Sequence, residues 1–107
     1  MNQKLSIFYT LCGSYIDAKN LSIEILNNNM ASCINLIKDI ESFYTEHKTV
    51  KNVVEFGLII KTLQPKNKFK KFLQSIHKYE IPFIAEIKVS NINQDYIDWA
   101  DQKTNNE

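Results

Sequence analysis

The stretch VVEFGLIIKT at residues 53–62 decides the fold, because it is the clearest buried strand in the chain. Val, Ile, Leu and Phe fill six of its ten positions, and a short apolar run of this kind is typical of a strand covered on both faces. Gly57 interrupts the run and predicts a β-bulge or a close approach of other backbone. The other elements are therefore expected to surround this strand.

The segment after this strand predicts a helix. Pro65 suits the first position of a helix. An apolar stripe follows at the i, i+3, i+4 and i+7 spacing of one helix face, formed by Phe69, Phe72, Leu73 and Ile76. Four lysines lie off the stripe: Lys66, Lys68, Lys70 and Lys71. We interpret them as a solvated face rather than a phosphate or nucleic-acid patch, because the run is short and lacks Arg.

Two strands and a helix precede residue 53. Residues 4–12 alternate as a strand, with Leu5, Ile7, Tyr9 and Leu11 on one face and Phe8, Thr10 and Cys12 on the other. Ser14 is a suitable N-cap for a helix that ends at the asparagines near residue 28. Residues 30–44 predict a long strand with a bend near residues 38–39, and residues 45–52 predict a polar hairpin tip.

The chain closes with one more strand and a short helix. Ile81-Pro82 ends the second helix region, and residues 83–89 alternate as a last strand. Residues 95–100 predict a short helix, and the polar tail from about residue 101 is expected to fray.

The order β-α-β-β-α-β with a short C-terminal helix predicts an α+β fold, ferredoxin-like, as a single domain over residues 1–107. Right-handed crossovers place both helices on one face of a four-stranded antiparallel sheet. The opposite face then has no cover from its own chain, although its strands are rich in Ile, Phe and Tyr. We therefore expect oligomers that form through this face, with the long hairpin reaching a neighbouring copy.

Charge and composition exclude several classes of function. The 13 basic residues are all Lys, and 12 acidic residues bring the net charge to +1, so neither nucleic acid nor an anionic membrane is an expected partner. No apolar run approaches the roughly 20 residues of a membrane-spanning helix. The N-terminus does not resemble a signal peptide, so we expect a cytoplasmic protein in which Cys12 and Cys33 are reduced thiols.

Four short segments occur in an order that resembles one known family. They are MASCIN at residues 30–35, LIIKT at 58–62, HKYEIP at 77–82 and DYIDW at 95–99, and Cys12 ends the strand before them. Over about residues 5–99 the chain resembles the CutA family of divalent-cation tolerance proteins. That family carries an A-[AS]-C-[VI]-N segment, an I-I-K-T segment, an H-P-Y-E-x-P segment and a Y-L-x-W ending.

The resemblance implies a ferredoxin-like homotrimer in the cytoplasm, with a role in tolerance to copper and other divalent metals. No enzymatic reaction is established for the family, and none is carried over. The chain departs from the pattern in two places. Lys78 stands where the family usually has Pro, and the hairpin tip lacks the usual Trp and Gly, with Glu46, His47, Lys48 and Thr49 across that stretch.

The topology brings a set of candidate metal ligands together. The first and last strands are neighbours, so Cys12 should approach residues 79–82, with His77 at the end of the helix just before them. Cys12, His77 and Glu80 offer thiolate sulfur, imidazole nitrogen and carboxylate oxygen, which suit copper or zinc, with copper expected first. Binding needs a deprotonated thiol and a neutral imidazole, so affinity should fall with acid.

A structural interpretation of the same residues remains open. Cys12 can serve as a small buried hydrophobe, His77 can cap the helix C-terminus, and Glu80 can pair with Lys61. Cys33 is expected in the core and His47 on the surface. Tyr96 and Trp99, three residues apart, are expected to form one packing face of the last helix rather than to stack on a ligand.

A second functional hypothesis is a small-molecule sensor or scaffold that resembles the trimeric PII signalling proteins, by analogy of fold. Lys61, Tyr79 and Glu80 would then line a cleft between subunits for an anionic or polar metabolite. Catalysis is not expected. A Cys12–His77 pair has no evident third group or oxyanion hole, and only two glycines leave no room for a nucleotide-binding glycine motif.

Overall fold

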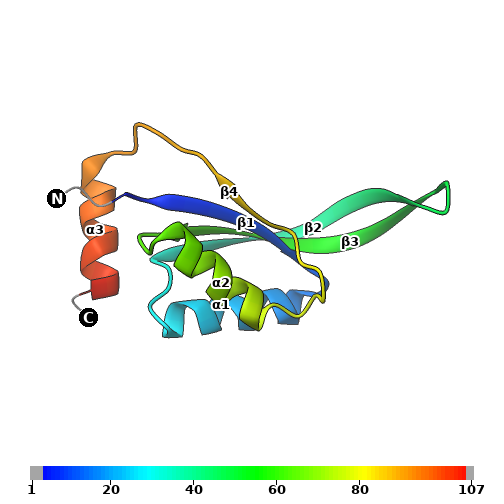
Figure 1. Cartoon of the computed structure of the whole chain (residues 1–107), viewed down its shortest axis with the longest axis horizontal. Coiled ribbons are helices and arrows are strands. Elements are labelled where there is room, and N and C mark those ends of the chain that lie inside the picture. The colour runs from blue at the N-terminus through cyan, green and yellow to red at the C-terminus, as the bar shows by residue number, and fades with distance from the viewer. Residues whose placement is uncertain (1–3, 106–107) are drawn as a thin grey trace.

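The computed structural model describes residues 4–105 and has one antiparallel sheet of four strands. The elements are β1 Ser6–Cys12, α1 Tyr15–Asn27, β2 Cys33–Glu46, β3 Thr49–Thr62, α2 Lys66–Ile76, β4 Ile84–Ile87 and α3 Gln94–Asn105. The strand order is β2-β3-β1-β4. Helices α1 and α2 cover the same face of the sheet, and α3 stands at one end (Figure 1). The predicted ferredoxin-like α+β fold is confirmed.

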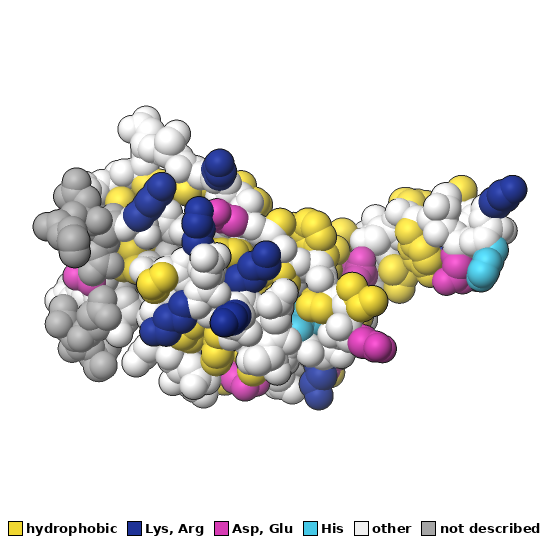
Figure 2. Space-filling view, viewed as in Figure 1, with side chains coloured by type: hydrophobic (Ala, Val, Ile, Leu, Met, Phe, Trp, Pro, Cys, Tyr) yellow, Lys and Arg dark blue, Asp and Glu magenta, His cyan; other side chains and the backbone are white. Residues whose placement is uncertain are grey.

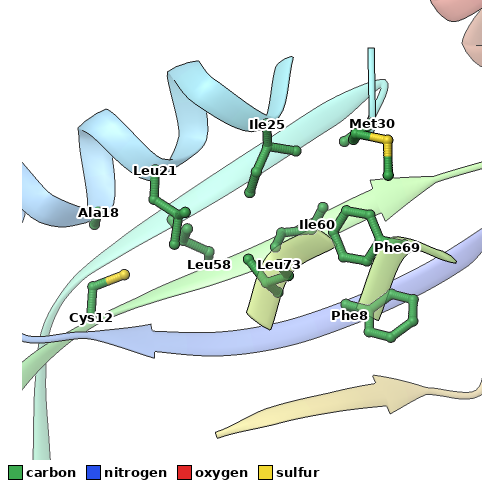
Figure 3. Packing of buried hydrophobic residues seen from close by; sticks show 11 residues of the cluster. Phe8, Cys12, Ala18, Leu21, Ile25, Met30, Leu58, Ile60, Phe69 and Leu73 are labelled. Atoms are coloured by element: carbon green, nitrogen blue, oxygen red, sulfur yellow. The ribbon is translucent and has the colours of Figure 1, made fainter. Parts of the chain in front are cut away.

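The core lies between this sheet face and the two helices. Phe8 of β1 stacks on Phe69 of α2 with ring centroids 4.8 Å apart, and Ile60 of β3 lies between the helices (Figure 3). Side chains with no more than 2% exposure include Phe8, Ile25, Leu58, Ile60, Phe69 and Leu73. The alternation of buried and half-buried residues along β1 matches the two faces that the sequence predicts.

Local sequence explains where the first helix starts. The Ser14 hydroxyl accepts a hydrogen bond from the Asp17 backbone N–H at 3.1 Å, which satisfies one of the free donors of α1. Asn29, with φ of 55°, turns the chain after the helix. Pro65 directly precedes α2 instead of occupying its first position, and its φ of −54° already suits a helix.

The last strand is shorter and the last helix longer than the sequence predicts. β4 pairs with β1 only from Ile84 to Ile87, so residues 83, 88 and 89 of the predicted strand lie outside the ladder. α3 continues to Asn105 rather than fraying from residue 101. Its Ala100 is fully buried and accepts a hydrogen bond from the Thr104 hydroxyl at 2.8 Å. Within residues 4–105 no helix has the length and apolar character to cross a membrane.

The hairpin tip predicted over residues 45–52 is correctly placed but too long, because the β2–β3 ladder continues to Glu46 and Thr49. Only His47 and Lys48 form the turn. Their φ angles of 51° and 64° are positive, as both central residues of a type I′ turn require. The strands form an arm, residues 40–55, that projects from the domain (Figure 1). Thr and Val in its ladder favour an extended chain despite the polar neighbours.

The arm begins at a bulge that the sequence predicts correctly. The β2–β3 register shifts between Ile37 and Ile40, and Asp39 there has a φ of 59°. Gly57 lies opposite the bulge, where a methyl group would come within 2.7 Å of Ile40 Cδ1 and 3.1 Å of the Tyr9 ring. The groups that approach Gly57 are side chains rather than the predicted backbone, and the bulge lies on the partner strand.

The face of the sheet opposite α1 and α2 is apolar. Ile37, Phe83 and Ile87 are 40%, 53% and 44% exposed, and Ile7, Tyr9 and Leu11 lie on the same face of β1. On the arm, Phe43 and Val50 are 66% and 69% exposed. Figure 2 shows hydrophobic side chains along the arm and lysines gathered over the body of the domain. The expected uncovered face is therefore present in the single chain.

Candidate functional site

One candidate site lies where β1 ends. As the topology predicts, Cys12 and Gly13 meet the segment after α2: a methyl group on Gly13 would lie 3.1 Å from the Tyr79 hydroxyl. Thr10, two residues before Cys12 on the same strand face, donates a hydrogen bond from its hydroxyl to the Phe83 carbonyl at 2.7 Å. The loop between α2 and β4 is therefore tied to the end of β1.

His77 uses both of its ring nitrogens inside this cluster. Nδ1 lies 3.0 Å from the Tyr79 backbone N–H and must accept its hydrogen, so the proton of the neutral ring is on Nε2. That Nε2–H donates to the Thr10 hydroxyl at 3.0 Å. Burial lowers the pKa of His77, which keeps the ring neutral and matches this tautomer. The Thr10 hydroxyl thus links His77 to the Phe83 carbonyl through two hydrogen bonds.

Cys12 is a core thiol. It is 3% exposed and its sulfur lies in the layer between α1 and the sheet (Figure 3). Burial raises its pKa to about 11, and the charges of Asp17 and Glu55 add to the rise. The thiol is therefore protonated at neutral pH, and a thiolate there carries a cost that a metal ion would have to offset.

The three predicted metal ligands do not converge in one chain. Glu80 is exposed, whereas Cys12 is buried and His77 is bonded at both nitrogens. Within the described residues no group of three or more His, Cys, Asp or Glu side chains is placed to hold a metal ion. The structure thus places both Cys12 and His77 beside the loop between α2 and β4, whereas the Glu80 side chain is exposed to solvent.

Tyr79 completes the cluster through Glu55. Its hydroxyl donates to a Glu55 carboxylate oxygen at 2.8 Å, and its ring lies over His77 with centroids 5.4 Å apart. Burial raises the pKa of Tyr79 to about 12, and the hydrogen bond and charge of Glu55 contribute. The phenol therefore stays a donor at any physiological pH.

Lys61 lies at the opposite end of the sheet. It pairs with Ile7 at the start of β1 and with Cys33 at the start of β2, whereas Tyr79 lies beside Gly13. Six residues of strand separate the two ends, roughly 20 Å. Lys61 and Tyr79 therefore line no common pocket within one chain, and the ion pair between Lys61 and Glu80 does not form.

The surroundings of Lys61 come from α3. Its Nζ lies 5.5 Å from the centre of the Tyr96 ring, and Tyr96 packs on Trp99 with centroids 5.4 Å apart. Burial raises the pKa of Tyr96, and the charge of Cys33 adds to the rise. The Tyr96 hydroxyl is buried beside the side chains of Ser32 and Cys33. Three of the four family-like segments, at residues 30–35, 58–62 and 95–99, meet at this end.

Sequence reasoning missed two members of the Cys12 cluster. Thr10 is fully buried and Glu55 is half-buried, and both hold the α2–β4 loop through side-chain hydrogen bonds. A hydroxyl on the buried face of a strand and an acid at the edge of an apolar run were the available signals, since buried polar groups require partners.

Comparison with known proteins fits this arrangement. The sequence profile of the CutA1 divalent ion tolerance protein family matches residues 6–103. The chain belongs to this family. The divalent-cation tolerance protein CutA of Pyrococcus horikoshii is 27% identical over 99 residues, which cover 92% of this chain and 96% of that protein. The corresponding Thermococcus kodakarensis protein is 29% identical over 94 residues, covering 87% and 89%.

Solved structures agree with the family assignment. The crystal structure of the divalent ion tolerance protein CutA1 from Ehrlichia chaffeensis superimposes with a TM-score of 0.90 at 30% identity. The match covers 97% of this chain and 98% of that chain. The CutA1 structure from Oryza sativa gives a TM-score of 0.83 at 24% identity over 96% and 95% of the two chains, which supports the fold. The resemblance found in the four sequence segments is confirmed.

Proposed function

We propose that this chain serves divalent-cation tolerance as a cytoplasmic homotrimer that binds a divalent metal, with copper the first candidate, and catalyses no reaction. Membership of the CutA1 family, from a match over residues 6–103, is the observation that carries this proposal. The family description supports the part played by divalent ions. The uncovered apolar sheet face supports self-assembly.

The trimer is tested by light scattering at micromolar concentration. The molar mass of wild type is expected to equal that of three chains. A monomer would expose to water the apolar area that Phe83 and Ile87 leave on the open face. Ile87→Lys places a charge on that face and is expected to release monomers. Ile16→Lys changes an exposed isoleucine on α1, 56% exposed against 44% for Ile87, and is the matched control. A stable wild-type monomer contradicts the proposal.

Metal binding is proposed through Cys12 and His77, which lie at the same loop, with Glu80 supplied after a rearrangement or by another copy. Thiolate and imidazole favour copper or zinc. Binding must remove the Cys12 proton and release one hydrogen bond of His77, so affinity is expected to be modest and to fall with acid.

Isothermal titration with copper and with zinc tests this set. The double variant Cys12→Ser with His77→Ala is expected to lose binding that wild type shows. The matched control is Cys33→Ser with His47→Ala, which removes the other thiol and the other imidazole. Indistinguishable titrations of wild type and the first double variant would end the proposal of these ligands.

Two observations support the remaining parts of the proposal. His77 has no free nitrogen with which to take a proton from Cys12, which speaks against nucleophilic catalysis by this pair. Cys12 and Cys33 are both unpaired, as thiols in a reducing compartment are. Fractionation of cells that express the tagged chain tests the compartment, and recovery from a membrane or secreted fraction contradicts it.

A small-molecule sensor is the second candidate function. Lys61 and Tyr79 lie at opposite ends of β1, so a cleft that uses both needs two subunits, as in the fold analogy with PII proteins. A thermal-shift screen of anionic and polar metabolites tests this candidate. Stabilisation that is lost in both Lys61→Gln and Tyr79→Phe supports a shared cleft, and a flat screen contradicts it.

A further inference from the structure

A pocket of about 330 Å³ lies between α3, the start of β1 and the connection from β4 to α3. Aliphatic side chains form much of its wall, among them Ile7, Val89 and Ile92. Lys61 and Tyr96 form another part, and Asn93 contributes an amide. Its size lies at the lower end of the range for small-molecule sites, and an apolar wall with a few polar groups is typical of them.

Lys61 is the only charged residue that lines this pocket within residues 4–105. Its Nζ lies 5.5 Å from the centre of the Tyr96 ring, and no described carboxylate forms an ion pair with it. The ammonium group of the half-buried Lys61 thus lies beside apolar walls and has no carboxylate partner among the described residues. The pocket is therefore complementary to an anion with an apolar body.

The connection over residues 88–93 shapes this region. Asn91, with a φ of 60°, turns the chain sharply there. A second pocket of about 230 Å³ shares Val89 and Ile92 with the first and adds Lys4 as its charged residue. The connection thus borders two hollows with aliphatic residues in their walls, one lined by Lys61 and the other by Lys4.

We propose that the pocket beside Lys61 binds a small carboxylate with an aliphatic or aromatic body, its carboxylate on the Lys61 ammonium group and its body against Ile7, Val89 and Ile92. The proposal needs neither a metal nor a cleft between subunits. Loss of metal binding, or of the trimer, in the experiments above would leave it standing.

The test uses hexanoate as the probe and the purified full chain, with isoleucine δ1-methyl groups labelled for NMR. Hexanoate is expected to bind saturably, to shift the methyl groups of Ile7 and Ile92, and to leave those of Ile16 and Ile23 on α1 unchanged. Hexanamide has nearly the same shape without the charge, and is expected to bind at least about tenfold more weakly.

Two variants locate the site. Lys61→Gln removes the charge and is expected to weaken hexanoate binding by about tenfold or more, whereas Lys88→Gln, an exposed lysine outside the pocket, changes it less than about twofold. Ile92→Trp fills the pocket while keeping Lys61 and is expected to abolish binding. Thermal unfolding of each variant confirms that it is folded.

Three results would overturn the proposal. They are the absence of saturable binding to wild type, equal affinity for hexanoate and hexanamide, and equal binding by wild type and a folded Lys61→Gln or Ile92→Trp variant. Methyl shifts confined to α1 would place the ligand elsewhere and would also overturn it.

Discussion

The two ends of strand β1 differ in how their polar groups are satisfied. At the Cys12 end, His77 is bonded at both nitrogens, Thr10 bonds on both sides, and Tyr79 donates to Glu55. At the other end, Lys61 lines a pocket and has no carboxylate partner among residues 4–105, and the Tyr96 hydroxyl is buried beside Ser32 and Cys33. The polar groups at the first end satisfy one another, so metal binding there has to break a hydrogen bond, whereas Lys61 at the second end is open to an anionic partner.

The largest effect that tests this contrast is expected for Thr10→Val. The substitution keeps the shape and removes the hydroxyl, so His77 Nε2–H and the Phe83 carbonyl both lose their partner. The free energy of unfolding is expected to fall by about 2–4 kcal/mol, as for two buried groups left unsatisfied. Urea unfolding measures it. Thr45→Val, on the exposed arm, is the control, and an equal effect at both positions would remove the special role of the cluster.

The next effect compares the two thiols. Cys12 is buried with a pKa of about 11, against an ordinary value of 9.0, so its thiolate fraction at neutral pH is about a hundredfold lower. Cys33, at the other end, is only half-buried. Alkylation by iodoacetamide is therefore expected to be far slower for Cys33→Ser, which retains Cys12, than for Cys12→Ser. Similar rates would show that Cys12 is accessible and activated.

A pH effect on stability is expected from His77. Burial lowers its pKa in the folded state, so the unfolded chain binds the proton more readily. Stability is therefore fully present above the unfolded value of about 6.5 and is lost as pH falls from there toward the lowered folded value. His77→Gln should flatten this part of the stability profile, measured by urea unfolding at each pH.

The exposed His47 of the arm is the matched control for that experiment. His47→Gln is expected to leave the slope as in wild type. If the two variants change the slope alike, the acid sensitivity does not originate in the Thr10–His77–Tyr79 chain of hydrogen bonds.

The smallest effect is expected at the other end. Lys61→Gln removes a cation–π contact with Tyr96 and breaks no ion pair among the described residues, so stability should change by less than about 1 kcal/mol. Urea unfolding measures this as well. A loss as large as that of Thr10→Val would make Lys61 a structural residue and would remove the contrast between the ends.

Much of the fold follows from local sequence signals. The apolar run at residues 53–62, the capping by Ser14 and the stripe that includes Phe69 and Leu73 specify the elements and their order. The sequence also predicts that Cys12 meets the loop after His77, because antiparallel neighbours place those ends together.

The errors concern features that tertiary contacts decide. The ladder of the arm continues through polar residues because each strand satisfies the backbone of the other, which composition at residues 45–52 does not reveal. The separation of Lys61 from Tyr79 follows from the antiparallel pairing of β3 with β1, which places the end of β3 beside the start of β1. Whether His77 has a free nitrogen depends on Thr10 and on the Tyr79 backbone, and neither contact has a signal in residue spacing.

The arm has a consequence for the chain before assembly. From residue 49 to residue 55, β3 pairs with β2 and with no other strand in the described part of the chain, so each strand of the arm has one unpaired edge. An isolated two-stranded ribbon is barely stable in water, and open edges invite strand addition. A newly synthesised copy therefore exposes strand edges that can pair with another chain. Charged side chains, such as Lys48 in the turn and Lys51 near it, disfavour such aggregation.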